Sequence, residues 1–233
     1  MWKHLTLLSG LLLLLSGCER AATSSATALY GARGSLTPTE FYTIKTGDTL
    51  FNIAWRYGLD IDELARWNDI TNQNRILAGS RIRLKPSDGQ PRKIDLPPPP
   101  QITAQGQSDW IWPTRGRVIR DFVANRPGYQ GIKIAGQRGQ DINSAHAGEV
   151  AYVGAGISGF GRMVILRHED RIFSAYGYLD SVEVQEGQQV AKGQKIATMG
   201  ISPQEAPALH FEIRQHGPSV NPYSFIGTTP RYH

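Results

Sequence analysis

The chain has 233 residues, of which 25 are Gly and 14 are Pro, while apolar residues make up 40% and aromatic residues 9%. This composition is typical of a globular protein with many turns, and it argues against a coiled coil or a long helical bundle. The 25 Lys and Arg residues exceed the 20 Asp and Glu residues only slightly, without runs of like charge, so the charge pattern argues against nucleic acid as a partner.

The N-terminus carries the pattern of an export signal. Its apolar stretch, Leu5 to Leu15, is shorter than the roughly 20 residues of a transmembrane helix. The sequence Leu-Ser-Gly-Cys that ends at Cys18 resembles the bacterial lipobox, whose cysteine becomes the lipid-bearing first residue of the mature protein. We therefore expect residues 1–18 to be a signal peptide and Cys18 to carry a lipid anchor in the membrane. By the same resemblance, Glu19 in place of Asp favours the periplasmic face of the outer membrane.

Two polar stretches divide the rest of the chain. Residues 19–40 are rich in Ala, Ser, Thr and Gly, and residues 86–109 contain the run Pro97–Pro100. Both stretches are predicted to be linkers, and the prolines favour a stiff, extended conformation in the second. The sequence thus predicts a small module at residues 41–85 and a larger one at residues 110–227.

The small module is predicted to fold in the order strand, helix, helix, strand. Thr49 and Asp60 are residue types that cap the N-termini of helices, and Gly58 is the type that ends one. The predicted elements are a strand at Phe41–Ile44, helices at Leu50–Tyr57 and Ile61–Trp67, and a closing strand at Arg81–Leu84.

The stretch Tyr42–Leu50, with Ile53, Ala54 and Asn68 after it, closely resembles the LysM domain. The resemblance implies a small α/β fold that binds N-acetylglucosamine-containing glycans, chiefly peptidoglycan, between two loops. The alternative for the polar residues of the first loop is that they only cap the helix, and Trp55 and Trp67 are expected in the core rather than as sugar platforms. The peptidoglycan-binding residues implied by the resemblance are Gly47, Asp48, Thr49 and Leu50 in the first loop and Asn74, Arg75, Ile76 and Leu77 in the second.

The larger module is predicted to be mainly β. Short alternating strands punctuated by glycines follow Trp110 and Trp112, which are expected to pack at the start of the module. Asn221 and Pro222 can begin a single closing helical turn. The clearest predicted strands are Arg117–Phe122, Glu149–Val153, Met163–Arg167 and Ile172–Tyr176.

Several stretches of this module, among them Gly131–Ala135, Val190–Ile196 and Leu209–Arg214, resemble the LytM-like fold of the lysostaphin-type zinc endopeptidases. Active members of that family hold zinc with the His and Asp of a motif HxGxD and with the second His of a motif HxH. Two further histidines act on the attacking water. The resemblance therefore implies a peptidase-like fold and directs attention to these five positions.

The sequence departs from the family pattern at four of the five positions. The HxGxD stretch begins with Tyr129 and ends with Lys133, Tyr178 replaces one catalytic histidine, and Ala208 replaces the first histidine of HxH, so that only His210 remains. A catalytic zinc needs about three protein ligands, and an ammonium group at a ligand position opposes a divalent cation. We therefore expect no catalytic residue, no bound metal, no cofactor and no enzymatic activity.

A lipid anchor, a LysM-like module and a degenerate LytM-like module together resemble the NlpD group of murein hydrolase activators. The resemblance implies activation of periplasmic N-acetylmuramyl-L-alanine amidases during the separation of daughter cells. The alternatives are a passive outer-membrane tether that binds peptidoglycan and, less favoured, a true zinc endopeptidase. The expected partner-binding groove is lined by Tyr129, Lys133, Tyr178 and His210.

Overall fold

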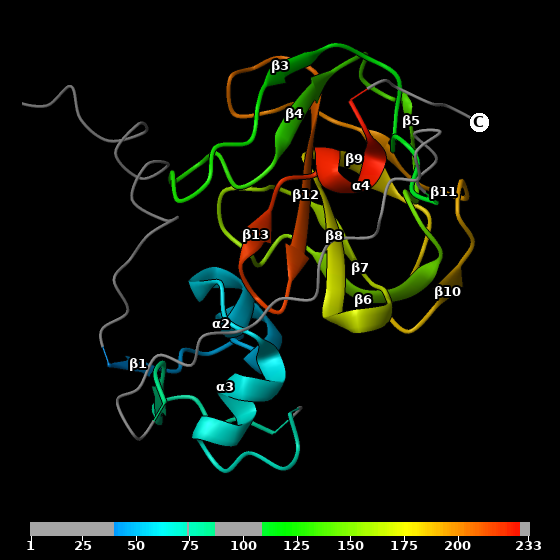
Figure 1. The fold of residues 1–233 in the computed structure, drawn as a ribbon. Helices are drawn as coiled ribbons and strands as arrows, with labels where there is room; N and C mark the ends of the chain where they lie inside the picture. The colour runs from blue at the N-terminus through cyan, green and yellow to red at the C-terminus, as the bar shows by residue number, and fades with distance from the viewer. Residues whose placement is uncertain (1–39, 74, 87–108, 229–233) are drawn as a thin grey trace, which may run out of the picture.

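The structure is a computed structural model that describes residues 40–73, 75–86 and 109–228. The predicted signal peptide, Cys18 and most of both predicted linkers lie outside these residues. The described residues form a small module (residues 40–86) and a β module (residues 109–228), and the two modules are in contact (Figure 1). Within the described ranges, no helix is long and apolar enough to span a membrane.

The small module has the predicted order of elements. Strands β1 (Phe41–Thr43) and β2 (Arg81–Arg83) pair antiparallel, with Tyr42 opposite Ile82. Helices α2 (Leu50–Tyr57) and α3 (Ile61–Trp67) lie between them in the chain and have the predicted bounds. The module has an apolar core of its own, formed by Ile44, Leu50, Ile53, Ala54, Leu64, Ala65, Ile82 and Leu84.

Local capping explains why the helix bounds follow from sequence. The Thr49 side chain accepts a hydrogen bond from the Asn52 amide at 3.0 Å, which satisfies one of the exposed amides at the start of α2. Asp60 does the same for α3, where one carboxylate oxygen accepts from two successive amides. Gly58 ends α2 in the left-handed conformation, with φ at 66°. These interactions span at most three residues, so sequence alone specifies them.

The β module contains two antiparallel sheets. The large sheet has the order β10-β6-β7-β8-β12-β4-β3 with β13 paired to β12, and the small sheet has the order β5-β11-β9. A short helix, α4 (Tyr223–Ile226), closes the module. The strands are β3 (Val118–Arg120), β4 (Ile132–Ala135), β5 (Asp141–Asn143), β6 (Gly148–Gly154), β7 (Met163–Arg167), β8 (Ile172–Gly177), β9 (Leu179–Val182), β10 (Gln189–Val190), β11 (Lys195–Met199), β12 (Ala208–Gln215) and β13 (Ser219–Val220).

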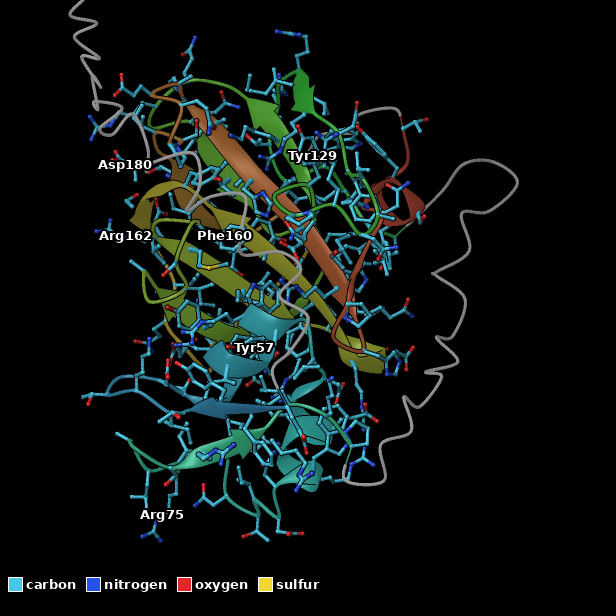
Figure 2. The ribbon with its side chains drawn as sticks, turned by 90° about the vertical axis from the view of Figure 1, so that its left-hand side faces the viewer. Tyr57, Arg75, Tyr129, Phe160, Arg162 and Asp180 are labelled. Carbon is cyan, nitrogen blue, oxygen red and sulfur yellow. The ribbon has the colours of Figure 1, made fainter. Side chains whose placement is uncertain are left out.

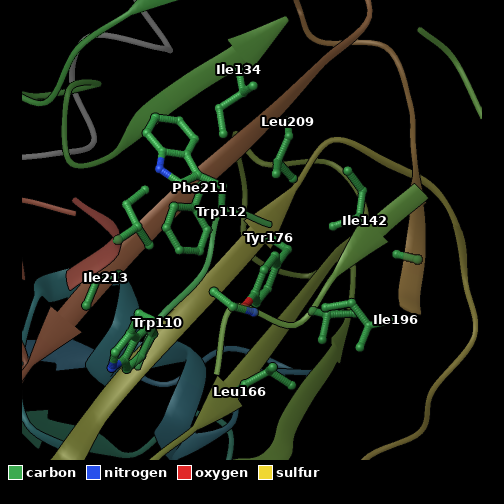
Figure 3. Close-up of a cluster of buried hydrophobic side chains, with 14 of the residues drawn as sticks. Trp110, Trp112, Ile134, Ile142, Leu166, Tyr176, Ile196, Leu209, Phe211 and Ile213 are labelled. Atoms are coloured by element: carbon green, nitrogen blue, oxygen red, sulfur yellow. The ribbon is translucent and has the colours of Figure 1, made fainter. Parts of the chain in front are cut away.

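The main core of the β module lies between its two sheets (Figure 3). Large buried side chains from β4, β8 and β12 meet Ile142 and Ile196 of the small sheet. Trp110 and Trp112 are buried in this core, which confirms the expected packing at the start of the module. Burial of aromatic rings of this size supplies much of the stability of such a fold.

The other face of the large sheet is covered by the small module. In β7, Val164 and Leu166 point into the main core, whereas Met163 and Ile165 belong to a second apolar cluster that contains Trp55 of α2. Trp55 is buried, as expected, and it packs against residues of the β module rather than within the core of the small module. Trp67 packs against the core of the small module as expected.

Candidate functional site

The candidate site in the β module is built on strand β12. Successive side chains of a strand point to opposite faces, so the alternation along β12 separates two sets of residues. Leu209, Phe211 and Ile213 face the main core. His210 and Glu212 face the opposite side together with Arg214, and all three are buried. The buried polar face of β12 is the starting point of the site.

These three residues form a continuous buried chain of charge-assisted contacts. His210 Nε2 lies 3.0 Å from Glu212 Oε2, and Arg214 Nε donates to Glu212 Oε1 at 2.7 Å. Burial acts to raise the pKa of Glu212, but Arg214 and His210 outweigh it, so the pKa of this carboxyl is lowered. Burial lowers the pKa of His210. The arrangement therefore holds Glu212 as a carboxylate inside the protein.

Lys133 lies directly opposite His210 in the pairing of β4 with β12. Its side chain is buried, with 5% exposure, and its ammonium group donates to the Gln204 side chain and lies 5.1 Å from the centre of the Tyr178 ring. Burial, with a smaller contribution from the nearby Arg120, lowers the pKa of Lys133 from 10.5 to about 8. A cationic side chain thus lies opposite the buried His210.

The lowered pKa of Lys133 predicts a pH-dependent stability. Because the folded state holds the proton less tightly than the unfolded chain, its charged form is destabilising, and this cost disappears as the pH rises from about 8 to 10.5. We expect the free energy of unfolding of the wild type, relative to Lys133→Met, to rise by up to about 3 kcal/mol over this range. Denaturant melts of both proteins between pH 7 and 10.5 measure this difference. A constant difference across the range would contradict the prediction.

The four predicted groove residues do come together, but most of them are not at the surface. Tyr178 and His210 have ring centres 6.0 Å apart, and both are buried, like Lys133. The expectation that these three side chains line an open groove is therefore wrong, because they are packed inside the β module. Only Tyr129 is partly exposed, on the face of the β module shown in Figure 2. Tyr129 is the predicted residue that a partner can reach directly.

The surface around Tyr129 is cationic and apolar. The Arg126 guanidinium lies 4.0 Å from the centre of the Tyr129 ring. The Arg120 guanidinium lies 5.4 Å from the same ring centre and also contacts His210. Val123 is 40% exposed and Ile201 is 47% exposed, on the two loops that flank Tyr129 and Lys133. Exposed apolar side chains beside an aromatic ring and arginines are typical of a protein-binding surface.

The residues around His210 do not fit a zinc ion. Both nitrogens of His210 are occupied, one by Glu212 and the other by Arg120 at 3.3 Å, and the side chain facing it carries an ammonium group. Zinc in such a site needs several nitrogen, sulfur or carboxylate ligands. Among residues 40–73, 75–86 and 109–228, no group of three or more His, Cys, Asp or Glu side chains could hold a metal ion.

We expect the purified protein to bind zinc at well below one ion per chain after dialysis. The physical reason is that a zinc ion at His210 would have to displace the Arg120 and Glu212 contacts while facing the charge of Lys133. Metal analysis measures the content, and a His210→Ala variant is the control for non-specific binding. One zinc per wild-type chain that is lost in His210→Ala would contradict the prediction.

The first predicted glycan loop is ordered by its own hydrogen bonds. The Asp48 carboxylate accepts from the Tyr42 hydroxyl at 2.6 Å, the Lys45 amide at 2.8 Å and Arg56 at 3.0 Å. Burial acts to raise the pKa of Asp48, but these hydrogen bonds lower it. Gly47 has a φ of 84°, which favours glycine at this turn. The loop is therefore a rigid platform, in which Asp48 has a structural role.

The other predicted glycan residues are placed differently from one another. Leu50 is fully buried in the core of the small module, so its expected contact with a sugar is wrong. Asn74 lies outside the described residues. Ile76 packs against the core, whereas Leu77 is exposed, and Arg75 lies at the end of the small module remote from the β module (Figure 2).

A crevice between the two modules was not expected from the sequence. Thr49 and Gln73 line it from the small module, and Glu149, Arg167 and Glu186 line it from the β module. Sequence analysis also assigned no role to Glu212 or Arg214 of β12. The signal was present, because the polar residues of the stretch Leu209–Arg214 alternate with apolar ones and so share one face of a strand.

Comparison with known proteins supports the assignment of both modules. Residues 42–85 match the LysM domain, and residues 127–222 match Peptidase family M23. The chain is 34% identical to the uncharacterized lipoprotein YgeR of Escherichia coli, over 94% of this chain and 92% of that protein. It is 31% identical to the murein hydrolase activator NlpD of Salmonella dublin, over 83% of this chain and 70% of that protein.

A third relative has a similar extent. The chain is 32% identical to the lipoprotein NlpD/LppB homolog of Pseudomonas aeruginosa, over 79% of this chain and 76% of that protein. These matches span both modules and most of each relative. The fold is thus a LysM domain followed by a mainly-β, M23 peptidase-like domain, as the sequence predicted. The chain belongs to the NlpD/LppB family of lipoproteins.

Proposed function

We propose that this protein is a non-enzymatic lipoprotein that binds peptidoglycan through its small module and activates a periplasmic N-acetylmuramyl-L-alanine amidase through its β module. The lipid on Cys18 would hold it at the periplasmic face of the outer membrane. Its place of action would be the septal wall, where amidases separate daughter cells. The mature protein would therefore activate the amidase while it is itself bound to peptidoglycan, the substrate of the amidase.

The observation that carries the proposal is the surface formed by Tyr129 with Arg126 over its ring and the exposed Val123 beside it. An interface of this kind needs an aromatic anchor, apolar neighbours and limited charge at its centre. The arginines favour a partner segment that is apolar and partly acidic. Since Lys133 takes the position of a ligand carboxylate, this surface is suited to protein contact rather than to metal-assisted hydrolysis.

The relatives support the same proposal. Two of them carry the names murein hydrolase activator and NlpD/LppB homolog, and the similarity extends over the whole two-module arrangement. The match of residues 42–85 to the LysM domain supports peptidoglycan as the bound polymer. Exposed residues of both predicted glycan loops, Thr49 after the Asp48 turn and Arg75 and Leu77 in the second loop, support a glycan site on this module.

The test combines the purified mature protein with dye-labelled peptidoglycan sacculi. We expect no dye release by the protein alone, sedimentation of the protein with sacculi, and strong dye release when a cognate amidase is added. Because the amidase alone gives the basal rate, the ratio of the two rates measures activation. Dye release by the protein alone would favour the zinc endopeptidase, and sedimentation without activation of any cognate amidase would favour the passive tether.

A further inference from the structure

The contact between the two modules has the character of a protein core. Phe51 of α2 stacks on Tyr152 at 6.1 Å and meets Phe173 edge-on at 5.9 Å. Trp55, one turn further along α2, meets Phe173 at 6.4 Å and is only 5% exposed. Beneath these rings lie four buried residues of the β module, Ile157, Met163, Ile165 and Ala175. Aromatic burial of this kind favours a defined docked arrangement of the two modules.

A buried arginine joins the modules at the same place. Arg214 lies 3.8 Å over the Trp55 ring and donates through Nη1 to the Trp55 carbonyl oxygen at 2.5 Å. The same guanidinium group donates through Nε to Glu212, which in turn holds His210. Separation of α2 from the sheet would leave the buried charge of Arg214 without its contacts to Trp55. The position of Glu212 and His210 therefore depends on the docked helix.

A second path leads from the contact between the modules to His210 and Tyr178, through the loop before β7. Phe160 packs against the apolar cluster that contains Trp55, and its ring lies 4.8 Å from the ring of His210. Its carbonyl oxygen accepts a hydrogen bond from the Tyr178 amide at 2.8 Å. Tyr178 is held with φ at 63°, a conformation that costs energy for a non-glycine residue and needs support from its surroundings.

We propose that the docked small module holds the surface around Tyr129 in its partner-binding shape, so that separating α2 from the sheet weakens amidase activation. This inference rests on the proposed function and adds its regulation. Both paths end at His210. Arg120 contacts His210 and also lies over the Tyr129 ring, so it connects His210 to the surface around Tyr129. By linkage, a change that weakens the docking of the small module also changes the affinity of the surface around Tyr129 for the partner. Docking of the small module and binding of the amidase are thereby coupled.

The experiment uses the full mature protein with Trp55→Ala, Phe173→Ala and the double variant. We expect each single variant to weaken activation about tenfold, within the usual range of coupling between sites. The double variant should lose little more, because both changes break the same contact. The control is Phe41→Ala, an aromatic residue of β1 that Arg81 and Arg83 cover within the small module. It should activate like the wild type.

Two further measurements test the docking of the small module independently of amidase activation. Sedimentation with sacculi shows whether the variants still bind peptidoglycan, and amide hydrogen exchange at Tyr178 reports the link to Phe160, with the Met199 amide, bonded to Gln140, as reference. We expect faster exchange at Tyr178 and unchanged exchange at Met199 in Trp55→Ala. Wild-type activation by folded Trp55→Ala and Phe173→Ala would overturn the inference. If the wild type activates no amidase, the proposed function fails, and unchanged exchange at Tyr178 would then overturn the coupling as well.

Discussion

Replacing Tyr129 with alanine is expected to weaken amidase activation about thirtyfold while the protein stays folded. The ring is partly exposed and stacked under Arg126, and the exposed Val123 lies beside it, with its amide bonded to the Tyr129 carbonyl oxygen. Loss of an aromatic anchor from the centre of an interface costs about 2 kcal/mol or more, which corresponds to this factor. The measurement is dye release from sacculi over a range of activator concentrations, together with a thermal melt.

The matched control is Tyr129→Phe, which keeps the ring and the stacking with Arg126 and should retain most of the activation. Tyr178→Ala provides the contrast, because Tyr178 is buried and its loss should lower the melting temperature. Full activation by a folded Tyr129→Ala protein would exclude this surface from the interaction with the amidase.

Replacing Glu212 with glutamine is expected to lower the stability of the protein by about 3 kcal/mol or more. The carboxylate is fully buried between His210 and Arg214, and its pKa is lowered, so the native state depends on its charge. Glutamine keeps the shape but leaves the charge of Arg214 inside the protein without its partner. For a chain of this size the melting temperature should fall by roughly 10 °C.

The matched control for this change is Glu183→Gln. Glu183 also accepts from a cation, Lys195 at 2.8 Å, but both side chains are exposed, and exposed ion pairs contribute little to stability. We expect its melting temperature to stay close to that of the wild type. A similar melting temperature for Glu212→Gln would show that the buried chain of charges on β12 is not needed for folding.

Much of the small module follows from interactions between residues close in sequence. Both helix bounds were predicted because Thr49, Asp60 and Gly58 act within a few residues of their own position. The strands of the β module were predicted from alternating apolar residues, and β7 has the predicted bounds, Met163–Arg167. These signals are local, so the tertiary structure was not required to find them.

The sequence indicated which residues to examine at the candidate site, but not which of their side chains are buried. The structure places Lys133 opposite His210 and Tyr178 beside it, and Arg120 contacts both Tyr129 and His210. The family motifs did not predict that three of the four predicted side chains are buried, leaving Tyr129 as the accessible one. Burial depends on which loops cover the strands, and that depends on contacts between residues distant in the chain.

The sequence by itself determined the division into two modules and the caps of the two helices of the small module. The stretch Met163–Arg167 was predicted only as a strand, and the structure shows both of its faces covered. Only the tertiary structure decided that α2 covers the second face, through Trp55 and Arg214, because an apolar residue shows that it will be buried but not against what. The hydrophobic effect is non-directional, so the partner of a buried side chain is selected by shape and by hydrogen bonds across the whole fold.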